Sequence, residues 1–300
     1  MKSIKFIYKN LYFRLAFVFL VGLAITFLIL DFTAPKIPIL GFHSINNIQN
    51  PNERPFLKSA FKGMNYQRQD FETVLNHLIF HNFWFLSTAD IYDYFITKSK
   101  PIPVEHIGQK PIMLSFDDGY KTNYTDLLYS LERVEKKYGQ KVKVVLFINP
   151  GTLANYESNA SIHMTCNDLR DGFKKGFYDL QSHGLTHKNL TQIETQKLIT
   201  ELGQAQVELR KCVEGLDLDS KVASHIAYPY GASNRKVESY ASKYYLSGYL
   251  YNSKLLKLSR FENPYKISRM TVNETHSPNK LIEIAERALK IQSPEATHSL

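Results

Sequence analysis

An apolar run that ends in two adjacent carboxylates constrains this chain more than any other feature. Residues 111–116 lead directly into Asp117 and Asp118, and Gly119 follows. Such a run predicts a strand of a parallel sheet that is buried on both faces, and these sheets gather their chemistry at the carboxyl ends of the strands. Neighbouring residues of an extended chain point in roughly opposite directions, so one carboxylate can bind a metal while the other stays free as a base. A strand end closed by an Asp-Gly turn is the plain alternative.

A pair of histidines follows about sixty residues later. His183 and His187 are four apart and could lie on one side of a helical turn. Because Gly184 disfavours a regular helix, a strand-to-loop turn could present them equally well. A pair of this kind is often an ordinary surface feature. Together with Asp118, the two imidazoles form a three-ligand set that leaves a coordination position for water, which is typical of catalytic metal sites.

The rest of the chain alternates between predicted strands and helices, without repeats or low-complexity tracts. We expect further strands over 37–42, 84–86, 142–148, 177–181 and 226–230, and helices over 71–79, 88–97, 124–138, 192–214, 234–244 and 278–290. Residues 50–66 read as a long loop and residues 152–172 as a connection. Repeated strand–helix units predict a parallel sheet in one large domain. Periodicity alone leaves open whether that sheet closes into a barrel or stays open and doubly wound.

The N-terminus has the charge pattern of a membrane anchor. Four basic residues precede an apolar run over 15–30, which spans roughly 24 Å at ~1.5 Å per residue. Residues 11–13 bring it within reach of the ~30 Å hydrocarbon core if Arg14 snorkels. Because no convincing cleavage site follows, we expect an uncleaved signal anchor over 1–33, with cleavage near Ala34 as the alternative. The basic flank should stay in the cytoplasm, so the domain of residues 34–300 should lie outside it.

Charge and cysteine content limit the partners. The formal net charge is +9, and the excess beyond the anchor fits either a solvated face or attraction to anionic envelope polymers. No basic cluster is interleaved with aromatic residues, so we expect no nucleic-acid partner. Cys166 and Cys212 could pair outside the cytoplasm, although nothing in the sequence shows that they are close.

Three motifs occur in the order and at the spacing of a known family. They are Ser-Phe-Asp-Asp-Gly-Tyr at 115–120, Ser-His-Gly-Leu-Thr-His at 182–187 and Ala-Tyr-Pro-Tyr-Gly at 227–231. The chain thereby resembles the polysaccharide deacetylases of carbohydrate esterase family 4 over roughly residues 37–273. It is most similar to the branch that deacetylates poly-N-acetylglucosamine, with its early element at 39–45 and its late Arg-x-x-Val at 269–272. The resemblance implies a distorted (β/α) barrel of about seven parallel strands, which would follow the N-terminal transmembrane helix expected from the apolar run.

The resemblance and the residue chemistry together imply a metal-dependent removal of N-acetyl groups from an N-acetylhexosamine polymer or envelope glycan. Asp118, His183 and His187 would bind one divalent ion, for which zinc is the default and cobalt or nickel would also fit. Asp117 would not ligate the ion and would accept the proton of the attacking water. The backbone N–H of Tyr230 would stabilise the oxyanion.

The general acid has no obvious source at the C-terminus. Most family members supply it from a late Leu-x-His motif, and none follows Arg269. The poly-N-acetylglucosamine branch places the equivalent imidazole near the N-terminus, which implies His43, with His276 as the fallback. Ala227 stands where many members carry an arginine that orients the base, and the only tryptophan, Trp84, is far from the family's fourth motif. Both absences suggest that Asp117 is held less rigidly.

The expected partners are an N-acetylated glycan and, through the N-terminal helix, a membrane; no protein partner is inferred. The same residues allow three other interpretations. One keeps the chemistry but acts on peptidoglycan or a lipid-linked sugar, or removes a formyl group. Another is a non-catalytic glycan-binding envelope protein, which would not need a complete ligand set. A dehalogenase-like phosphatase is excluded because its chemistry uses Asp-x-Asp, whereas Asp117 and Asp118 are adjacent.

Overall fold

A parallel sheet forms the centre of the computed structural model, which describes residues 13–23, 25–26, 34–47, 63–155, 162–258 and 263–292. The strand order is β10-β9-β8-β7-β6-β2-β12, and β5 also pairs with β6. Every pairing in this sheet is parallel. The strands are β2 (Ile39–Phe42), β5 (Phe83–Phe85), β6 (Lys110–Asp117), β7 (Val144–Ile148), β8 (Tyr178–Ser182), β9 (His225–Ala227), β10 (Ser247–Tyr249) and β12 (Met270–Thr271).

One short segment joins the two ends of this sheet. Ile267 forms an isolated parallel bridge with Tyr249 of β10, and three residues later Met270 of β12 pairs with Leu40 of β2. The sheet therefore curves into a barrel that residues 267–271 bring together. The predicted parallel α/β barrel of about seven strands is confirmed.

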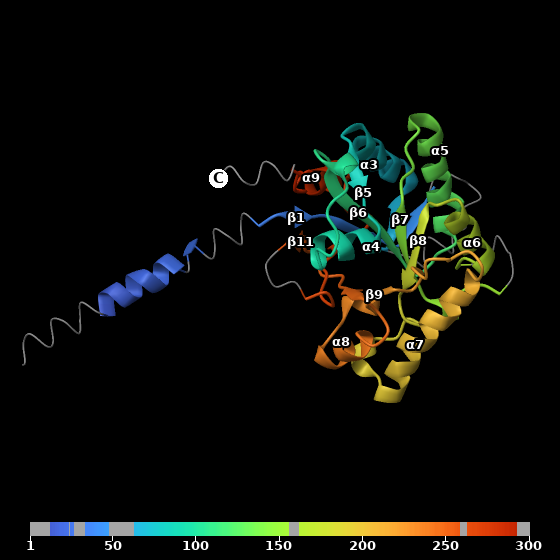
Figure 1. Ribbon diagram of the computed structural model, residues 1–300. Helices are drawn as coiled ribbons and strands as arrows, with labels where there is room; N and C mark the ends of the chain where they lie inside the picture. The colour runs from blue at the N-terminus through green and yellow to red at the C-terminus, as the bar shows by residue number, and fades with distance from the viewer. Residues whose placement is uncertain are drawn as a thin grey trace, which may run out of the picture.

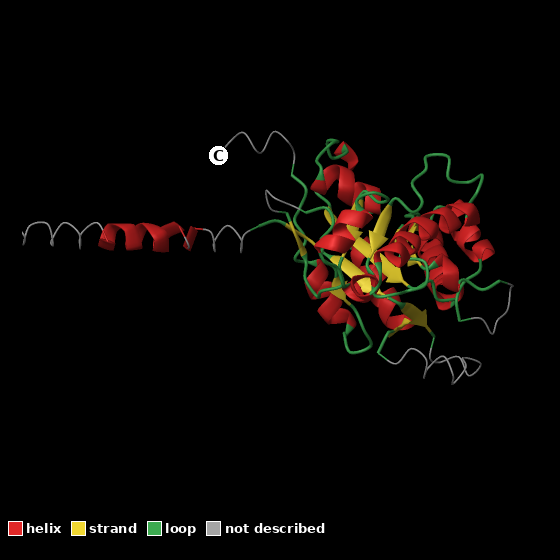
Figure 2. Ribbon diagram, turned by 90° about the horizontal axis from the view of Figure 1, so that it is seen from below, coloured by secondary structure: helices red, strands yellow, loops and turns green. Residues whose placement is uncertain are grey.

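Helices cover the outside of the sheet (Figure 1). Seen from below, the strands gather at the centre and the helices surround them (Figure 2). The α-helices are α3 (Arg68–Phe80), α4 (Thr88–Asp90), α5 (Leu128–Tyr138), α6 (Cys166–Lys174), α7 (Thr195–Cys212), α8 (Arg235–Ala241) and α9 (Pro278–Ala285). Two predicted helix ends are confirmed because a single residue fixes each of them. Helix α5 ends at the left-handed Gly139, and the Ser277 side chain caps the start of α9.

Burial on both faces explains the unbroken apolar run of β6. Leu114 and Phe116 pack in the cluster that includes the α3 side chains, whereas Met113 packs with Val145 and Phe147 inside the barrel. Side chains of a strand alternate between its two faces. Asp117, at the end of β6, therefore comes to the interior face at the mouth of the barrel.

Several predicted segments differ from the structure. The helix expected over 88–97 is α-helical only as α4 and continues as a π-helix, Ile91–Ile96, and the helix expected over 278–290 ends at Ala285. The connection expected over 152–172 contains the start of α6, which begins with a capping box between Thr165 and Asp168. The strand expected over 226–230 ends at Ala227, because Pro229 starts a short 3₁₀ turn, Pro229–Gly231. Of the predicted loop over 50–66, residues 50–62 lie outside the described residues.

Smaller elements extend the domain at its edges. The strand β1 (Lys36–Ile37) pairs antiparallel with β11 (Leu256–Lys257), and β3 (Ser44–Asn46) pairs parallel with β4 (Asn65–Gln67). The two cysteines form a disulfide that ties the start of α6 to the end of α7, with a Cα–Cα distance of 5.0 Å.

Residues 13–23 are helical and lie apart from the domain in both views (Figures 1 and 2). In the part of the chain that the structure describes, no helix combines the length and the apolar character needed to cross a membrane. The remainder of the predicted anchor, residues 1–12, 24 and 27–33, lies outside the described residues.

Candidate active site

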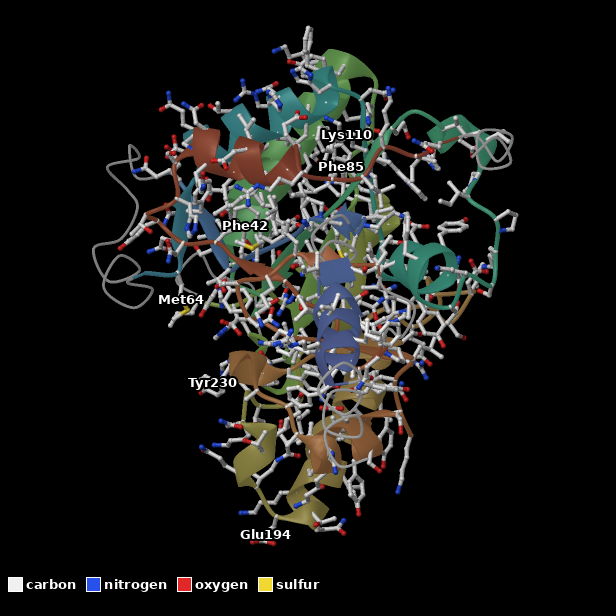
Figure 3. The ribbon with its side chains drawn as sticks, turned by 90° about the vertical axis from the view of Figure 1, so that its left-hand side faces the viewer. Phe42, Met64, Phe85, Lys110, Glu194 and Tyr230 are labelled. Atoms are coloured by element: carbon white, nitrogen blue, oxygen red, sulfur yellow. A yellow bond between two sulfur atoms is a disulfide. The ribbon has the colours of Figure 1, made fainter. Side chains whose placement is uncertain are left out.

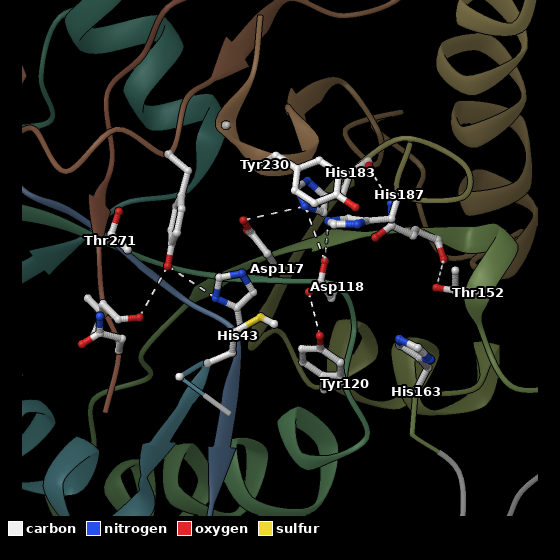
Figure 4. A pocket seen from close by; sticks show the side chains of 17 residues that line it. His43, Asp117, Asp118, Tyr120, Thr152, His163, His183, His187, Tyr230 and Thr271 are labelled. Carbon is white, nitrogen blue, oxygen red and sulfur yellow. Dashed lines mark hydrogen bonds and ion pairs between the residues drawn. The ribbon is translucent and has the colours of Figure 1, made fainter. Parts of the chain in front are cut away.

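The carboxyl ends of the parallel strands bring the predicted site residues together. Phe42 of β2 pairs with Phe116 of β6, so His43 and Asp117 follow at the same level on adjacent strands. Further along, Ile148 of β7 pairs with Ser182 of β8, the residue before the first histidine of the pair. One pocket of about 650 Å³ is lined by all six predicted residues, namely His43, Asp117, Asp118, His183, His187 and Tyr230 (Figure 4).

The backbone turns sharply between the two aspartates. Asp117 is the last residue of β6, and Asp118 has a left-handed φ of 71°. The expectation that the two carboxylates point apart, as on a continuing strand, is therefore wrong. The left-handed residue ends the extended chain, and both carboxylates face the same pocket (Figure 4).

Asp118 lies between the two imidazoles. Its Oδ1 is 3.5 Å from His183 Nε2 and 3.3 Å from His187 Nε2, while its Oδ2 accepts a hydrogen bond of 2.9 Å from the Tyr120 hydroxyl. Oδ1 is buried and has no hydrogen-bond partner among the described residues. A buried carboxylate oxygen without a partner is costly. The two nitrogens and this oxygen could together hold a metal ion, because their ligand atoms lie within 4.8 Å of one another.

The second nitrogen of His183 fixes the ring. Its Nδ1 lies 2.8 Å from the carbonyl oxygen of Ala227, which can only accept, so Nδ1 carries the proton and Nε2 presents its lone pair to Asp118. Burial lowers the pKa of His183, although Asp117 and Asp118 oppose this shift. The neutral ring is the form that binds metal.

A loop, not a helix, presents the two histidines. Gly184 and His187 both have positive φ, 75° and 58°. The Asn149 side chain donates hydrogen bonds to the carbonyls of His183 and Gly184, and Glu201 of α7 accepts from the N–H groups of residues 185 and 186 at 2.9 Å. These contacts hold the loop, so the two rings keep their positions relative to Asp118.

Arg269 binds Asp117 from inside the barrel. Its guanidinium donates to both carboxylate oxygens, at 2.7 and 2.8 Å, and its Nε donates to the Leu250 carbonyl at 2.9 Å. Arg269 is fully buried. The expectation that Asp117 is held loosely because residue 227 is alanine is therefore wrong, since an arginine reaches the base from the segment that closes the barrel. Burial alone would raise the pKa of Asp117. The positive charge of Arg269, and next to it His183, outweighs this effect and lowers the pKa to about 2.

His43 and Tyr230 complete opposite sides of the pocket. His43 Nδ1 is 3.4 Å from the Tyr251 hydroxyl, and the two rings meet edge to face. Tyr230 has a left-handed φ of 60°, its ring packs on His187 at 4.6 Å, and no described residue accepts a hydrogen bond from its backbone N–H. The fallback acid, His276, does not line this pocket and instead contacts the Asn273 side chain at 2.9 Å.

Four residues of the site had no role in the sequence-based assignment. Tyr120 follows the Asp-Asp pair and orients Asp118, and Arg269 begins the Arg-x-x-Val motif, so motifs marked both positions. Tyr251 and His163 carried no such signal. His163 lines the pocket and stacks on Tyr120 at 5.4 Å, and burial lowers its pKa.

The fold and the site define a class: a parallel α/β barrel with an Asp-His-His cluster beside an ionised aspartate. The family model of the polysaccharide deacetylases matches residues 105–248, and this part of the chain belongs to that family. Its members are hydrolases that act on carbohydrate amide or ester bonds.

Similar proteins agree with this assignment. YxkH of Bacillus subtilis (strain 168), named as a polysaccharide deacetylase, is 23% identical over 208 residues, which cover 69% of this chain and 61% of that protein. The chain thus spans less than two thirds of that relative. A polysaccharide deacetylase of Bacillus cereus has the same fold, with a TM-score of 0.66, 20% identity, and coverage of 84% of this chain and 69% of that one.

Two further structures share the fold along almost their whole length. The deacetylase PplD of Streptococcus pyogenes, solved with acetate, matches with a TM-score of 0.65 and 20% identity over 87% of this chain and 100% of that one. IcaB of Ammonifex degensii matches with a TM-score of 0.61 and 15% identity over 84% of this chain and 97% of that one.

Proposed function

We propose that this chain is a metal-dependent hydrolase that removes N-acetyl groups from a polymer or glycan of N-acetylhexosamine, and that poly-N-acetylglucosamine is its substrate class. The observation that carries the proposal is the pairing of two different carboxylates at one pocket. Asp118 has an oxygen without a hydrogen-bond partner between two imidazoles, whereas both oxygens of Asp117 are compensated by Arg269.

Asp118, His183 and His187 fit one divalent ion. The lone buried oxygen and the neutral His183 ring are the donors that such an ion needs, and zinc is the default for a carboxylate and two imidazoles. When bound, the ion would polarise the acetyl carbonyl and lower the pKa of water from about 15.7 toward about 7.

The remaining steps belong to the chain's own residues. Asp117, ionised by Arg269, accepts the proton of the water that attacks the acetyl carbon, and the Tyr230 N–H donates to the oxygen that becomes negative. The C–N bond then breaks as His43 protonates the departing nitrogen. The products are acetate and a sugar amine.

Three tyrosines support a sugar substrate. Tyr120, Tyr230 and Tyr251 all line the pocket, and the Tyr230 side chain is 66% exposed. Aromatic faces present a broad apolar surface that can pack on a pyranose ring. The choice of the poly-N-acetylglucosamine branch is supported by His43, an imidazole that directly follows β2 and lines the same pocket as Asp117 and Asp118.

We further propose that residues 1–33 anchor the enzyme in a membrane and that residues 34–300 form a catalytic domain outside the cytoplasm. The apolar side chains of residues 13–23 are exposed in the structure, for example Phe13 at 72% and Val18 at 67%. The disulfide between Cys166 and Cys212 supports an oxidising compartment.

The decisive experiment measures acetate release by the full-length protein in detergent from a panel of N-acetylated substrates. The panel contains poly-N-acetylglucosamine, peptidoglycan, a lipid-linked N-acetyl sugar and an N-formyl sugar. We expect release from the first, its loss on chelation and its return with zinc. His187→Ala should lose the zinc of this site and the activity together, whereas a His187→Ala protein that keeps the parent's full zinc content would refute the ligand assignment.

A further inference from the structure

A second cluster of ligating side chains lies where α3 meets α9. His77 is in the last turn of α3, His81 follows it by one helical turn, and Glu286 is the residue after α9. Residues four apart on a helix share a face. One ligand atom from each of the three side chains lies within 4.8 Å of the others.

This cluster is separate from the candidate active site. Glu286 contacts Lys110, the first residue of β6, whereas Asp117 is the last residue of that strand. Seven steps of about 3.3 Å along a strand place the two regions roughly 23 Å apart, at opposite ends of the sheet. Figure 3 shows Lys110 far from Tyr230, which lines the pocket.

The local geometry suits a transition metal. His77 Nε2 lies 3.0 Å from Glu286 Oε1, and the His77 and His81 rings are 4.1 Å apart at an angle of 32°. Two imidazoles and a carboxylate are a common zinc ligand set, with water in the remaining position. We propose that His77, His81 and Glu286 bind a divalent transition-metal ion of the zinc type, which joins the end of α9 to the end of α3.

One positive charge opposes the ion. The Lys110 ammonium contacts Glu286 Oε2, which leaves Oε1 as the oxygen that faces His77. Glu286 can therefore offer a single oxygen to a metal, and the nearby ammonium weakens the attraction for any cation. Removing the charge of Lys110 should tighten metal binding.

The site lies at the start of the segment that fastens the C-terminal region. Beyond Glu286, the N–H of Leu289 donates to the Lys36 carbonyl, and Ile291 exchanges backbone hydrogen bonds with residues 108 and 109. An ion that fixes Glu286 against α3 would hold this segment in place. We therefore expect the metal to stabilise the fold without changing the chemistry at the pocket.

Metal counting tests the proposal in the full-length protein in detergent. After chelation and dialysis against zinc, elemental analysis should find one zinc per chain in His183→Ala, which removes a ligand of the active-site cluster. Adding His81→Asn should remove that zinc. Adding His106→Asn should leave it, because this histidine lies at the same end of β5 and β6 but stacks on Trp84. Equal zinc with and without His81→Asn would overturn the proposal, as would the absence of zinc in His183→Ala.

Stability and affinity give a second readout. Zinc should raise the melting temperature of His183→Ala and of its His106→Asn derivative, but not of its His81→Asn derivative. The exposed position of His81 makes that substitution compatible with folding. In the His183→Ala background, Lys110→Met should bind zinc more tightly. Weaker binding by Lys110→Met, or an equal thermal shift in the His81→Asn protein, would contradict the site. His81→Asn alone should keep the parent's acetate release.

Discussion

Asp117 and Asp118 show how two adjacent residues of one type acquire different chemistry. Arg269 satisfies both oxygens of Asp117 and keeps it ionised, whereas Asp118 retains one buried oxygen without a partner. A buried negative charge without a partner favours a cation, and a fully compensated one does not. The environments therefore separate the proposed metal ligand from the proposed base.

Arg269→Met should affect both stability and the pH profile. Breaking a buried ion pair on one side costs about 3–5 kcal/mol, because Asp117 remains buried without its partner. The double variant Arg269→Met/Asp117→Asn should recover part of that loss in denaturant unfolding. Without Arg269 the pKa of Asp117 rises from about 2, so the acid limb of kcat/KM should move to higher pH. An unchanged acid limb would show that Asp117 is not the base.

The base and the acid should differ in what rescues their loss. Asp117→Asn and His43→Ala should both retain metal and lose about 10²–10⁴-fold in activity on the glycan. An aryl acetate has a leaving group that needs little protonation. His43→Ala should therefore recover much of its relative rate on that substrate, whereas Asp117→Asn should not, since water must still lose a proton.

The rival assignment of the acid provides the control for this comparison. His276→Ala should behave like the parent, because that side chain contacts Asn273 and does not line the pocket. If His276→Ala were inactive and His43→Ala fully active on the glycan, the acid would come from the C-terminal segment.

At the scale of elements, the sequence predicted the strands and helix ends that depend on a local pattern of residues. The buried strands follow from apolar runs, and the end of α5 and the cap of α9 follow from single residues, Gly139 and Ser277. Helix α6 was missed because few of its side chains are apolar: its buried residues include Asp168 and Gly172 besides Leu169. The sequence of α6 therefore lacks the apolar repeat that predicts a helix. In the structure, the disulfide and the packing against α7 hold α6 in place.

The motifs identified the six site residues, but the sequence could not show what supports them. The bond from Arg269 to Asp117 depends on β12 lying beside β2, which is a contact between segments at opposite ends of the domain. Glu201 likewise reaches the histidine loop from the middle of α7. Such contacts follow from the closed barrel and leave no periodic trace in the chain.

Removing the disulfide should weaken the domain through the link between α6 and α7. Cys166 and Cys212 are 46 residues apart in sequence, and closing a loop of that length restricts the unfolded chain by about 4 kcal/mol. We expect Cys166→Ser/Cys212→Ser to lower the free energy of unfolding by roughly that amount in denaturant titrations. The parent under reducing conditions is the matched control and should unfold at the same midpoint. Equal midpoints for the oxidised parent and the double variant would contradict the link.

At the scale of the whole molecule, the domain and the N-terminal helix differ in the burial of their apolar side chains. The described residues of the domain bury most of their large apolar side chains in three clusters, and none of these clusters includes a residue of 13–23. The helical residues 13–23 instead expose Phe17, Phe19 and Leu20 at 61–67%. Contiguous exposed apolar side chains of this kind mark a surface that another phase or partner covers.

The membrane proposal can be tested by fractionation. The full-length protein should sediment with membranes and require detergent for release, whereas a protein without residues 1–33 should be recovered without detergent. Leu20→Asp is the sharper variant: a charge near the centre of an apolar span costs about 2.5–3.5 kcal/mol on insertion, enough to shift the protein toward the soluble fraction. Ser3→Asp, outside the run, should not do so. A reporter that needs an oxidising compartment should be active when fused after residue 300. Recovery of the full-length chain in the soluble cytoplasmic fraction would end the proposal, because a chain anchored in a membrane by an apolar helix needs detergent for its release.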